Sequence, residues 1–261
     1  MSAISLDDQT VHYEVLGRGA ALIFVHGWLG SWRYWVPAMQ TLSSRCRTYA
    51  LDLWGFGDSS RRPERYSLEA QSALLRGFMD ELGIGQAAIV GHSFGGALAL
   101  RLAAEQPERV TRLMAVSVPL VGAAVNPRLS GTAAAVLIEW LLGRGPVADQ
   151  VGVEAGKADI AALDACVRAV MSPDVRADLG RVRAPCLLVH GERDPAVAAP
   201  QEAWLENANA SPVHRISFEE LRHFPMLEDA TKFNRLLLDF LEVGDDLTKL
   251  QLKEEWKRRM R

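Results

Sequence analysis

The residues with the clearest chemical potential form the run Gly91-His92-Ser93-Phe94-Gly95. This run has the pattern G-x-S-x-G, in which a serine stands at the top of a tight turn between a strand and a helix. The serine is strained there, and its glycine neighbours avoid a collision between a Cβ and the adjoining strand and helix. An apolar run ends at Gly91 and a helix-period run follows it. We therefore expect Ser93 to be a nucleophile.

A serine hydroxyl needs a base that removes its proton and a third group that orients the base. His223 lies on a loop between a late strand and the last core helix. Open α/β sheets place their sites on such loops, at the carboxyl edge of the sheet, so we assign His223 as the base. The other histidines are less suitable. His26 and His190 end strands beside glycine, and His92 adjoins the serine on a turn that points elsewhere. His12 and His214 lie in segments typical of a sheet edge.

Two acidic residues, Glu192 and Asp194, follow the apolar run at 186–190 and fall on the same expected edge of the sheet. We favour Asp194 as the acid that orients His223. Glu192 has a local partner in Arg193, with which we expect it to form an ion pair.

An acyl-transfer site also needs two backbone N–H groups aimed at the oxygen that becomes negatively charged. One should belong to Phe94, which directly follows the serine at the start of a helix. The other should come from the loop at 25–30, with Trp28 as the donor, because Gly27 lets this loop approach closely.

No pattern in the chain indicates a metal or another cofactor. The three cysteines are widely spaced, which fits neither a disulfide framework nor a zinc site. Asp52 and Asp58 follow an apolar run, but a buried aspartate that caps the next loop explains them without chemistry. We therefore expect a site that works with side chains and backbone groups alone.

Short apolar runs alternate with longer helix-period stretches along most of the chain. This alternation predicts an α/β fold with a mostly parallel central sheet and helices on both faces. The continuous apolar runs are typical of parallel strands buried on both sides. Strands are expected at 21–26, 48–52, 88–91, 113–118 and 186–190, with an antiparallel hairpin at 4–6 and 11–16. Helices are expected at 33–42, 68–82, 96–105, 200–207 and 225–241.

The strand and helix alternation divides the chain into a core at 1–119 and 181–243 and an Ala-rich insertion at 120–180. Because the insertion shows no convincing strand, we expect it to be a small helical lid between core strands. Residues 244–261 form a charged extension, which we expect to be a solvated or back-packed helix, with a homodimer contact or an interfacial membrane helix as the alternatives. Its apolar face would consist of Leu252, Trp256 and Met260.

Size and charge exclude some classes of partner. A chain of 261 residues is long enough to enclose a dry pocket in one domain. Its net charge of −3, with both signs mixed, provides no basic stripe for nucleic acid. The chain has neither a signal-peptide pattern at its beginning nor an apolar run long enough to be a transmembrane segment. We therefore expect a cytoplasmic protein that acts on a small molecule.

Five segments occur in a characteristic order: HGW at 26–28, DLWGFGDSS at 52–60, GHSFGG at 91–96, GERD at 191–194 and HFP at 223–225. Together they resemble the α/β-hydrolase fold family, and within it the single-domain serine esterases, lipases and cofactor-free haloperoxidases. The resemblance spans about residues 10–242 and includes the family order of serine, acid and histidine. It implies hydrolysis of a carboxylic ester through an acyl-serine intermediate.

The resemblance leaves the substrate open. Haloalkane dehalogenases and epoxide hydrolases of this family carry aspartate where this chain has Ser93, which disfavours their chemistry. A carbon–carbon bond (diketone) hydrolase, a lactonase and a small-molecule receptor of the same fold remain alternatives. Apolar residues near these loops are expected to form a substrate pocket: Leu29, Val197 and Phe224 in the core, and Leu137, Ile138, Trp140 and Leu141 in the lid. For the lid residues, packing alone is the alternative.

Overall fold

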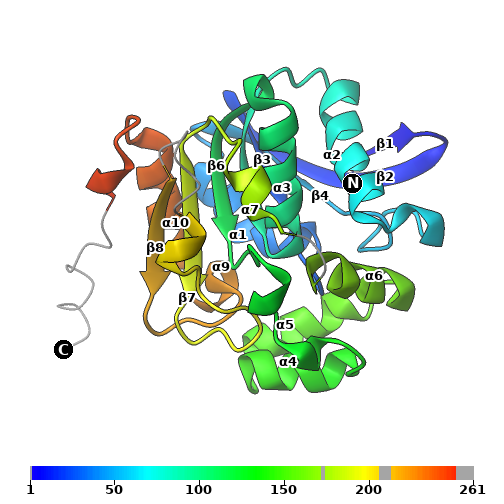
Figure 1. Ribbon diagram of the computed structural model, residues 1–261. Coiled ribbons are helices and arrows are strands. Elements are labelled where there is room, and N and C mark those ends of the chain that lie inside the picture. Colours follow the sequence, from blue (N-terminus) through cyan, green and yellow to red (C-terminus); the bar gives the residue numbers. More distant parts are fainter. Residues whose placement is uncertain (1, 172–173, 206–212, 251–261) are drawn as a thin grey trace.

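The computed structural model describes residues 2–171, 174–205 and 213–250 (Figure 1). Its centre is an eight-stranded sheet in the order β1-β2-β4-β3-β5-β6-β7-β8. The pairs β1–β2 and β2–β4 are antiparallel, and all the others are parallel, so the predicted fold class is confirmed. The strands are β1 Ser2–Leu6, β2 Gln9–Gly17, β3 Ala20–Val25, β4 Cys46–Leu51, β5 Ala87–His92, β6 Val110–Val116, β7 Cys186–Gly191 and β8 Val213–Phe218.

Burial along the strands follows their place in the sheet. Every residue of β5 and β7 is buried, as expected for parallel strands covered on both faces. By contrast, β1 alternates between half-buried and exposed residues, which is typical of an edge strand with one solvated face. The strand β2 lies between β1 and β4, so His12 is buried inside the sheet. The expectation that His12 belongs to an edge segment was therefore wrong.

Helices cover both faces of the sheet, with α3 in front and α1 behind in Figure 1. Their bounds are α1 Val36–Leu42, α2 Leu68–Glu81, α3 Phe94–Glu105, α8 Glu202–Leu205, α9 Pro225–Glu228 and α10 Ala230–Glu242. The single helix expected at 225–241 is thus two helices. At Asp229 the backbone leaves the helical conformation (φ −142°, ψ 76°), and its side chain accepts a hydrogen bond from the Lys232 N–H at the start of α10.

Among the residues described between β6 and β7, four α-helices occur: α4 Ala134–Leu142, α5 Pro146–Ala155, α6 Ile160–Met171 and α7 Arg176–Leu179. Figure 1 shows α4, α5 and α6 grouped at one end of the sheet, whereas α7 lies against α3 on the core. The group formed by α4, α5 and α6 is called the lid below.

The chain continues beyond α10 into a single helical turn at Leu247–Lys249. Leu247 and Leu250 are buried, so this part of the expected extension packs back onto the core. The apolar face proposed for Leu252, Trp256 and Met260 lies outside the described residues. Over the range that the structure describes, no helix has the length and apolar character needed to cross a membrane.

Candidate active site

Ser93 stands at the sharp turn between β5 and α3, with φ 51° and ψ −115°. Its N–H donates to the carbonyl oxygen of Val116 on the neighbouring strand at 2.7 Å, which holds the strained turn against the sheet. A Cβ on Gly91 would lie 2.4 Å from the Gly95 oxygen, and one on Gly95 would lie 2.4 Å from the His26 oxygen. Both contacts are impossible for real atoms, so the two glycines are a steric requirement of the turn.

His223 and Asp194 meet at the carboxyl edge of the sheet. Asp194 follows β7, and His223 lies between β8 and α9. The distance from His223 Nδ1 to Asp194 Oδ2 is 2.7 Å, and both side chains are almost fully buried. The other Asp194 oxygen accepts hydrogen bonds from the N–H groups of Ala196 and Val197 at 2.8 and 3.2 Å. Because a carboxylate only accepts, the hydrogen lies on Nδ1, and Nε2 is left as the basic nitrogen.

The nucleophile turn and the histidine loop contact each other through His92. His92 Nε2 is 2.8 Å from the main-chain oxygen of His223, and the two imidazole ring centres are 4.9 Å apart. The expectation that His92 points away from the site was therefore wrong. No hydrogen bond joins the Ser93 hydroxyl to His223 among the residues the structure describes. Such bonds are often long until substrate is bound.

The loop after β3 is fixed by the imidazole of His26. The Leu53 N–H donates to His26 Nε2 at 3.0 Å, so the ring hydrogen lies on Nδ1 and is donated to the Gly27 oxygen at 2.8 Å. Burial lowers the pKa of His26, which keeps the ring in this neutral form. In a trans peptide the C=O and the next N–H point in opposite directions. The Trp28 N–H is therefore aimed away from His26.

This loop lies directly against the nucleophile turn. A Cβ on Gly27 would lie 2.9 Å from the Ser93 Cβ and 2.6 Å from the His92 oxygen. Neither the Trp28 N–H nor the Phe94 N–H donates a hydrogen bond within the described ranges. The two groups are thus available as donors near the serine.

Of the candidate pocket residues on loops, Phe224 packs against the expected base. Its ring centre is 5.1 Å from that of His223, 5.0 Å from that of His92 and 6.0 Å from that of Tyr34. Leu29 is fully buried in a left-handed conformation (φ 61°), and its oxygen accepts a hydrogen bond from the Tyr34 hydroxyl. These contacts place Phe224 beside the base and Leu29 in the loop that carries the Trp28 N–H.

The other pocket candidates make contacts of three kinds. Val197 is buried and hydrogen-bonded to Asp194, and Leu137 and Leu141 are fully buried in α4. Ile138 lines a groove of about 870 Å³ between α4 and α5, which none of Ser93, Asp194 and His223 lines. The guanidinium carbon of Arg128 lies over the Trp140 ring, 5.0 Å from the ring centre. The Leu141 oxygen is 3.5 Å from Arg222 Nη1, so the end of α4 reaches the loop of the base.

Glu192 does not pair with Arg193, contrary to the sequence-based expectation. Its carboxylate accepts a hydrogen bond from the Ser217 hydroxyl at 2.7 Å on the neighbouring strand β8. Arg193 instead forms an ion pair with Glu220. Each of the two side chains has a different partner in or just after β8, so their closeness in sequence gave no ion pair.

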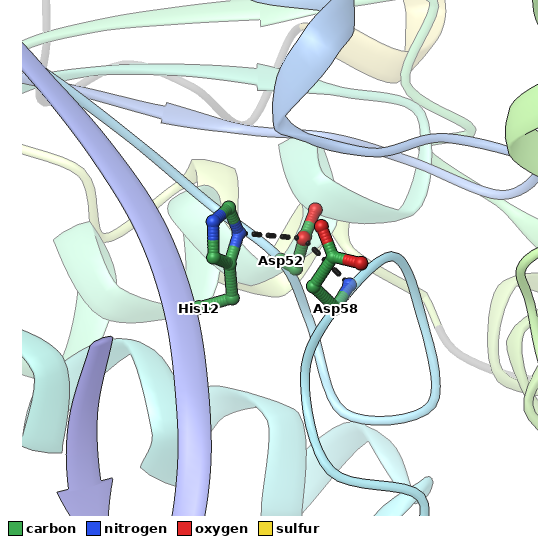
Figure 2. Close-up of side chains that lie close together, drawn as sticks. All are labelled: His12, Asp52 and Asp58. Atoms are coloured by element: carbon green, nitrogen blue, oxygen red, sulfur yellow. Dashed lines mark hydrogen bonds and ion pairs between the residues drawn. The ribbon is translucent and has the colours of Figure 1, made fainter. Parts of the chain in front are cut away.

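Figure 2 shows His12, Asp52 and Asp58, the one group of three potential metal ligands found in the described part of the chain. The Asp52 oxygens are already used: they accept from the Trp32 N–H at 2.9 Å and the Asp58 N–H at 3.0 Å, and Oδ2 lies 3.0 Å from His12 Nδ1. Asp52 thus caps the loop that follows β4, as the sequence predicts, and the group has a structural explanation.

Sequence reasoning missed Glu228, which accepts hydrogen bonds from the main chain of the histidine loop. Its carboxylate accepts the N–H groups of Arg222 at 2.9 Å and Phe224 at 2.8 Å. Burial raises the pKa of Glu228, although these two N–H groups act in the opposite direction. The available signal was a helix start at Pro225 with an acid in its first turn, where a side chain often reaches back to free N–H groups.

Comparisons with known proteins point to one fold family. A family model described as "alpha/beta hydrolase fold" matches residues 20–146. The chain is 36% identical over 126 residues to bifunctional epoxide hydrolase 2 of Sus scrofa, an alignment that covers 46% of this chain and 22% of that protein. It therefore spans about a fifth of the length of that relative.

Two further matches extend over nearly the whole chain. The chain is 28% identical to the pimeloyl-[acyl-carrier protein] methyl ester esterase of Nitrosomonas europaea, with 86% of this chain and 96% of that protein covered. The crystal structure of the enol-lactonase from Burkholderia xenovorans LB400 superimposes with a TM-score of 0.81 at 20% identity, covering 93% of this chain and 100% of that one. This structural match establishes a shared fold.

Proposed function

Because the chain belongs to the α/β-hydrolase fold family, we propose that it is a serine hydrolase that cleaves carboxylic esters of small, largely apolar substrates. The observation that carries the proposal is the buried 2.7 Å hydrogen bond between Asp194 and His223. The loop of His223 is joined to the nucleophile turn through His92. A histidine oriented by a carboxylate beside a strained serine is the arrangement that nucleophilic acyl transfer requires.

In the first half of the reaction, His223 Nε2 removes the proton from the Ser93 hydroxyl as Oγ attacks the ester carbonyl carbon. The carbonyl oxygen becomes negatively charged and is held by the N–H groups of Trp28 and Phe94. The tetrahedral intermediate then collapses. Its C–O bond to the alcohol breaks, and the alcohol leaves with the proton that His223 had taken.

The second half releases the acid. A water molecule gives a proton to His223 Nε2 and attacks the acyl carbon of the acyl-serine, which again forms an oxyanion between Trp28 and Phe94. Collapse returns the proton to Ser93 and frees the carboxylic acid. Throughout, Asp194 stays ionised and keeps the hydrogen of the resting imidazole on Nδ1.

The esterase of Nitrosomonas europaea supports this reaction class, because the alignment covers almost the whole of both chains and its name states methyl ester hydrolysis. The match to epoxide hydrolase covers less than half of this chain. Epoxide opening in this family uses a carboxylate nucleophile, and this chain has Ser93 in that position. We therefore propose ester cleavage. Lactones and vinylogous diketones belong in the substrate panel because the same three side chains serve their hydrolysis.

The test combines turnover of short p-nitrophenyl esters with intact-mass labelling by a fluorophosphonate. We expect one adduct in the wild-type protein and none in Ser93→Ala, together with loss of turnover. Ser117→Ala is the matched control, because Ser117 is also buried, also follows a strand and also has a positive φ of 49°. A Ser117→Ala protein should keep both label and turnover. A fluorophosphonate adduct that survives Ser93→Ala contradicts the proposal, and a protein with neither adduct nor turnover fits a receptor instead.

A further inference from the structure

His92, the residue before the serine, is fully buried, and its side chain reaches the loop of the base. Its Nε2 lies 2.8 Å from the main-chain oxygen of His223, a residue 131 positions away. Its ring packs against the rings of His223 and Phe224, with centres 4.9 and 5.0 Å away. His92 therefore links the turn that carries the nucleophile to the loop that carries the base.

The hydrogen bond defines the form of this imidazole. A carbonyl oxygen only accepts, so the hydrogen of His92 lies on Nε2. Nδ1 has no hydrogen-bond partner in the described ranges and lies 3.0 Å from where a Cβ on Gly27 would be. Burial, and next the charge of a protonated His223, lower the pKa of His92 well below its usual range. His92 is thus a neutral donor at physiological pH and takes no proton itself.

The other hydrogen bonds to the histidine loop come from elements other than the nucleophile turn. Asp194, after β7, holds the imidazole of His223, and Glu228 in α9 holds the N–H groups of Arg222 and Phe224. Of the hydrogen bonds to this loop in the part of the chain described, the bond from His92 alone begins at the nucleophile turn. Without it, no hydrogen bond directly sets the spacing between the turn and the loop.

We propose that His92 is a positioning residue whose Nε2–H fixes the main chain of His223 relative to Ser93, so that the basic Nε2 of His223 faces the serine hydroxyl. The effect on rate rests on the proposed function, while the hydrogen bond itself does not. Reactions between held groups are sensitive to displacement, and an error of 1 Å costs on the order of a hundredfold in rate. Loss of the His92 donor should therefore lower kcat by about 10- to 100-fold with little change in KM.

Two substitutions separate hydrogen bonding from packing. His92→Gln keeps an N–H donor of similar reach but loses the ring, whereas His92→Phe keeps a ring of similar size and loses the donor. If the donor positions His223, Gln should retain a kcat within a few-fold of wild type and Phe should show the full loss. If His92 only fills space, the order should be reversed. Thermal unfolding checks that each variant folds, and His92→Leu replaces Phe if the larger ring prevents folding.

A second measurement is independent of turnover. The hydrogen between His223 Nδ1 and Asp194 should give a low-field proton NMR signal, identified by its loss in His223→Ala. We expect His92→Gln to retain this signal and His92→Phe to shift or broaden it, because the imidazole is no longer held by its main chain. Unchanged kcat and an unchanged signal in His92→Phe would overturn the inference. An inactive wild type would contradict the esterase proposal, while the NMR comparison would still decide the role of His92.

Discussion

Asp194 contributes to the site through both carboxylate oxygens. Oδ2 accepts from His223, and Oδ1 accepts from the N–H groups of Ala196 and Val197. In Asp194→Asn, the amide oxygen can take the place of Oδ1 and preserve the loop, but an NH₂ group then faces His223 Nδ1. The imidazole must move its hydrogen to Nε2 and can no longer accept the serine proton.

We therefore expect Asp194→Asn to fold normally and to lower kcat for a p-nitrophenyl ester by about 10³- to 10⁴-fold, as the loss of the correct tautomer does in serine proteases. Glu192→Gln is the matched control, because Glu192 follows the same strand but bonds to Ser217, and its activity should stay within about twofold. Activity of Asp194→Asn close to wild type would show that another acid orients the imidazole.

At the residue scale, the sequence predicts Ser93, Asp194 and His223 as the site because each lies at a recognisable strand end or turn, and the structure joins the last two by a hydrogen bond. The sequence was insufficient for His92 and Glu228. His92 acts on a main-chain carbonyl and Glu228 acts on N–H groups, and main-chain groups leave no mark in the residue types of the chain. Their roles depend on how two distant loops meet, which only the folded chain shows.

At the element scale, the lid helix α5 is attached to the core through Glu154. Glu154 is buried and accepts the Ser31 hydroxyl at 2.7 Å, and its carboxylate lies 2.8 Å from Lys157 Nζ and 3.5 Å from Arg33 Nη1. Ser31 lies close after Trp28 in the sequence and also caps the turn that follows. The lid helix α5 is thus bonded to the loop that presents an expected oxyanion donor.

Breaking this attachment should affect both stability and rate. Glu154→Leu leaves the buried Ser31 hydroxyl without its acceptor, so we expect a loss of about 1–3 kcal/mol in the free energy of unfolding in urea. It should also lower kcat by severalfold, because the loop with Trp28 is less restrained. Asp149→Asn, an exposed acid on the same helix, should change neither by more than about 0.5 kcal/mol or twofold. Equal behaviour of the two variants would contradict a role for Glu154 as an anchor.

The sequence predicted the elements whose position depends on local patterns. It did not predict features that depend on pairing between distant segments. The buried parallel strands read as continuous apolar runs and were placed within a few residues. That β2 lies inside the sheet depends on its pairing with β4, thirty or more residues later, which its own alternation does not reveal. The division between α9 and α10 was missed because the apolar period continues across Asp229, where the backbone leaves the helical conformation and the side chain caps the start of a second helix.

At the scale of the whole molecule, His12 and Asp52 join the antiparallel hairpin to the parallel part of the sheet. His12 Nδ1 on β2 is 3.0 Å from Asp52 Oδ2 after β4, and a dashed line marks this contact in Figure 2. Burial lowers the pKa of His12, but the Asp52 hydrogen bond and the charges of Asp52, Asp58 and Glu14 act the other way and leave it raised. Arg33 lies 3.5 Å from Asp58 on the side nearer to solvent.

A raised pKa in the folded state means that the folded protein binds the proton more tightly than the unfolded chain does. The stabilisation is therefore complete below the pKa of an unfolded histidine and is lost as pH rises through the higher folded value. The buried His26 and His92 have lowered pKa values and act in the opposite direction, so that their contribution is lost as pH falls. The pH profile of the wild type combines both effects, and only a difference between variants isolates His12.

We expect the stability difference between wild type and His12→Asn, measured as the free energy of unfolding in urea, to be larger at pH 6 than at pH 8.5. The reason is that the raised pKa of His12 makes the charged His12–Asp52 pair more populated at the lower pH. In an Asp52→Asn background the same His12→Asn substitution should have a much smaller pH dependence, because the principal partner of the imidazolium is gone. A difference that grows with pH instead would mean that burial dominates and that the hairpin is joined to the sheet through a neutral histidine.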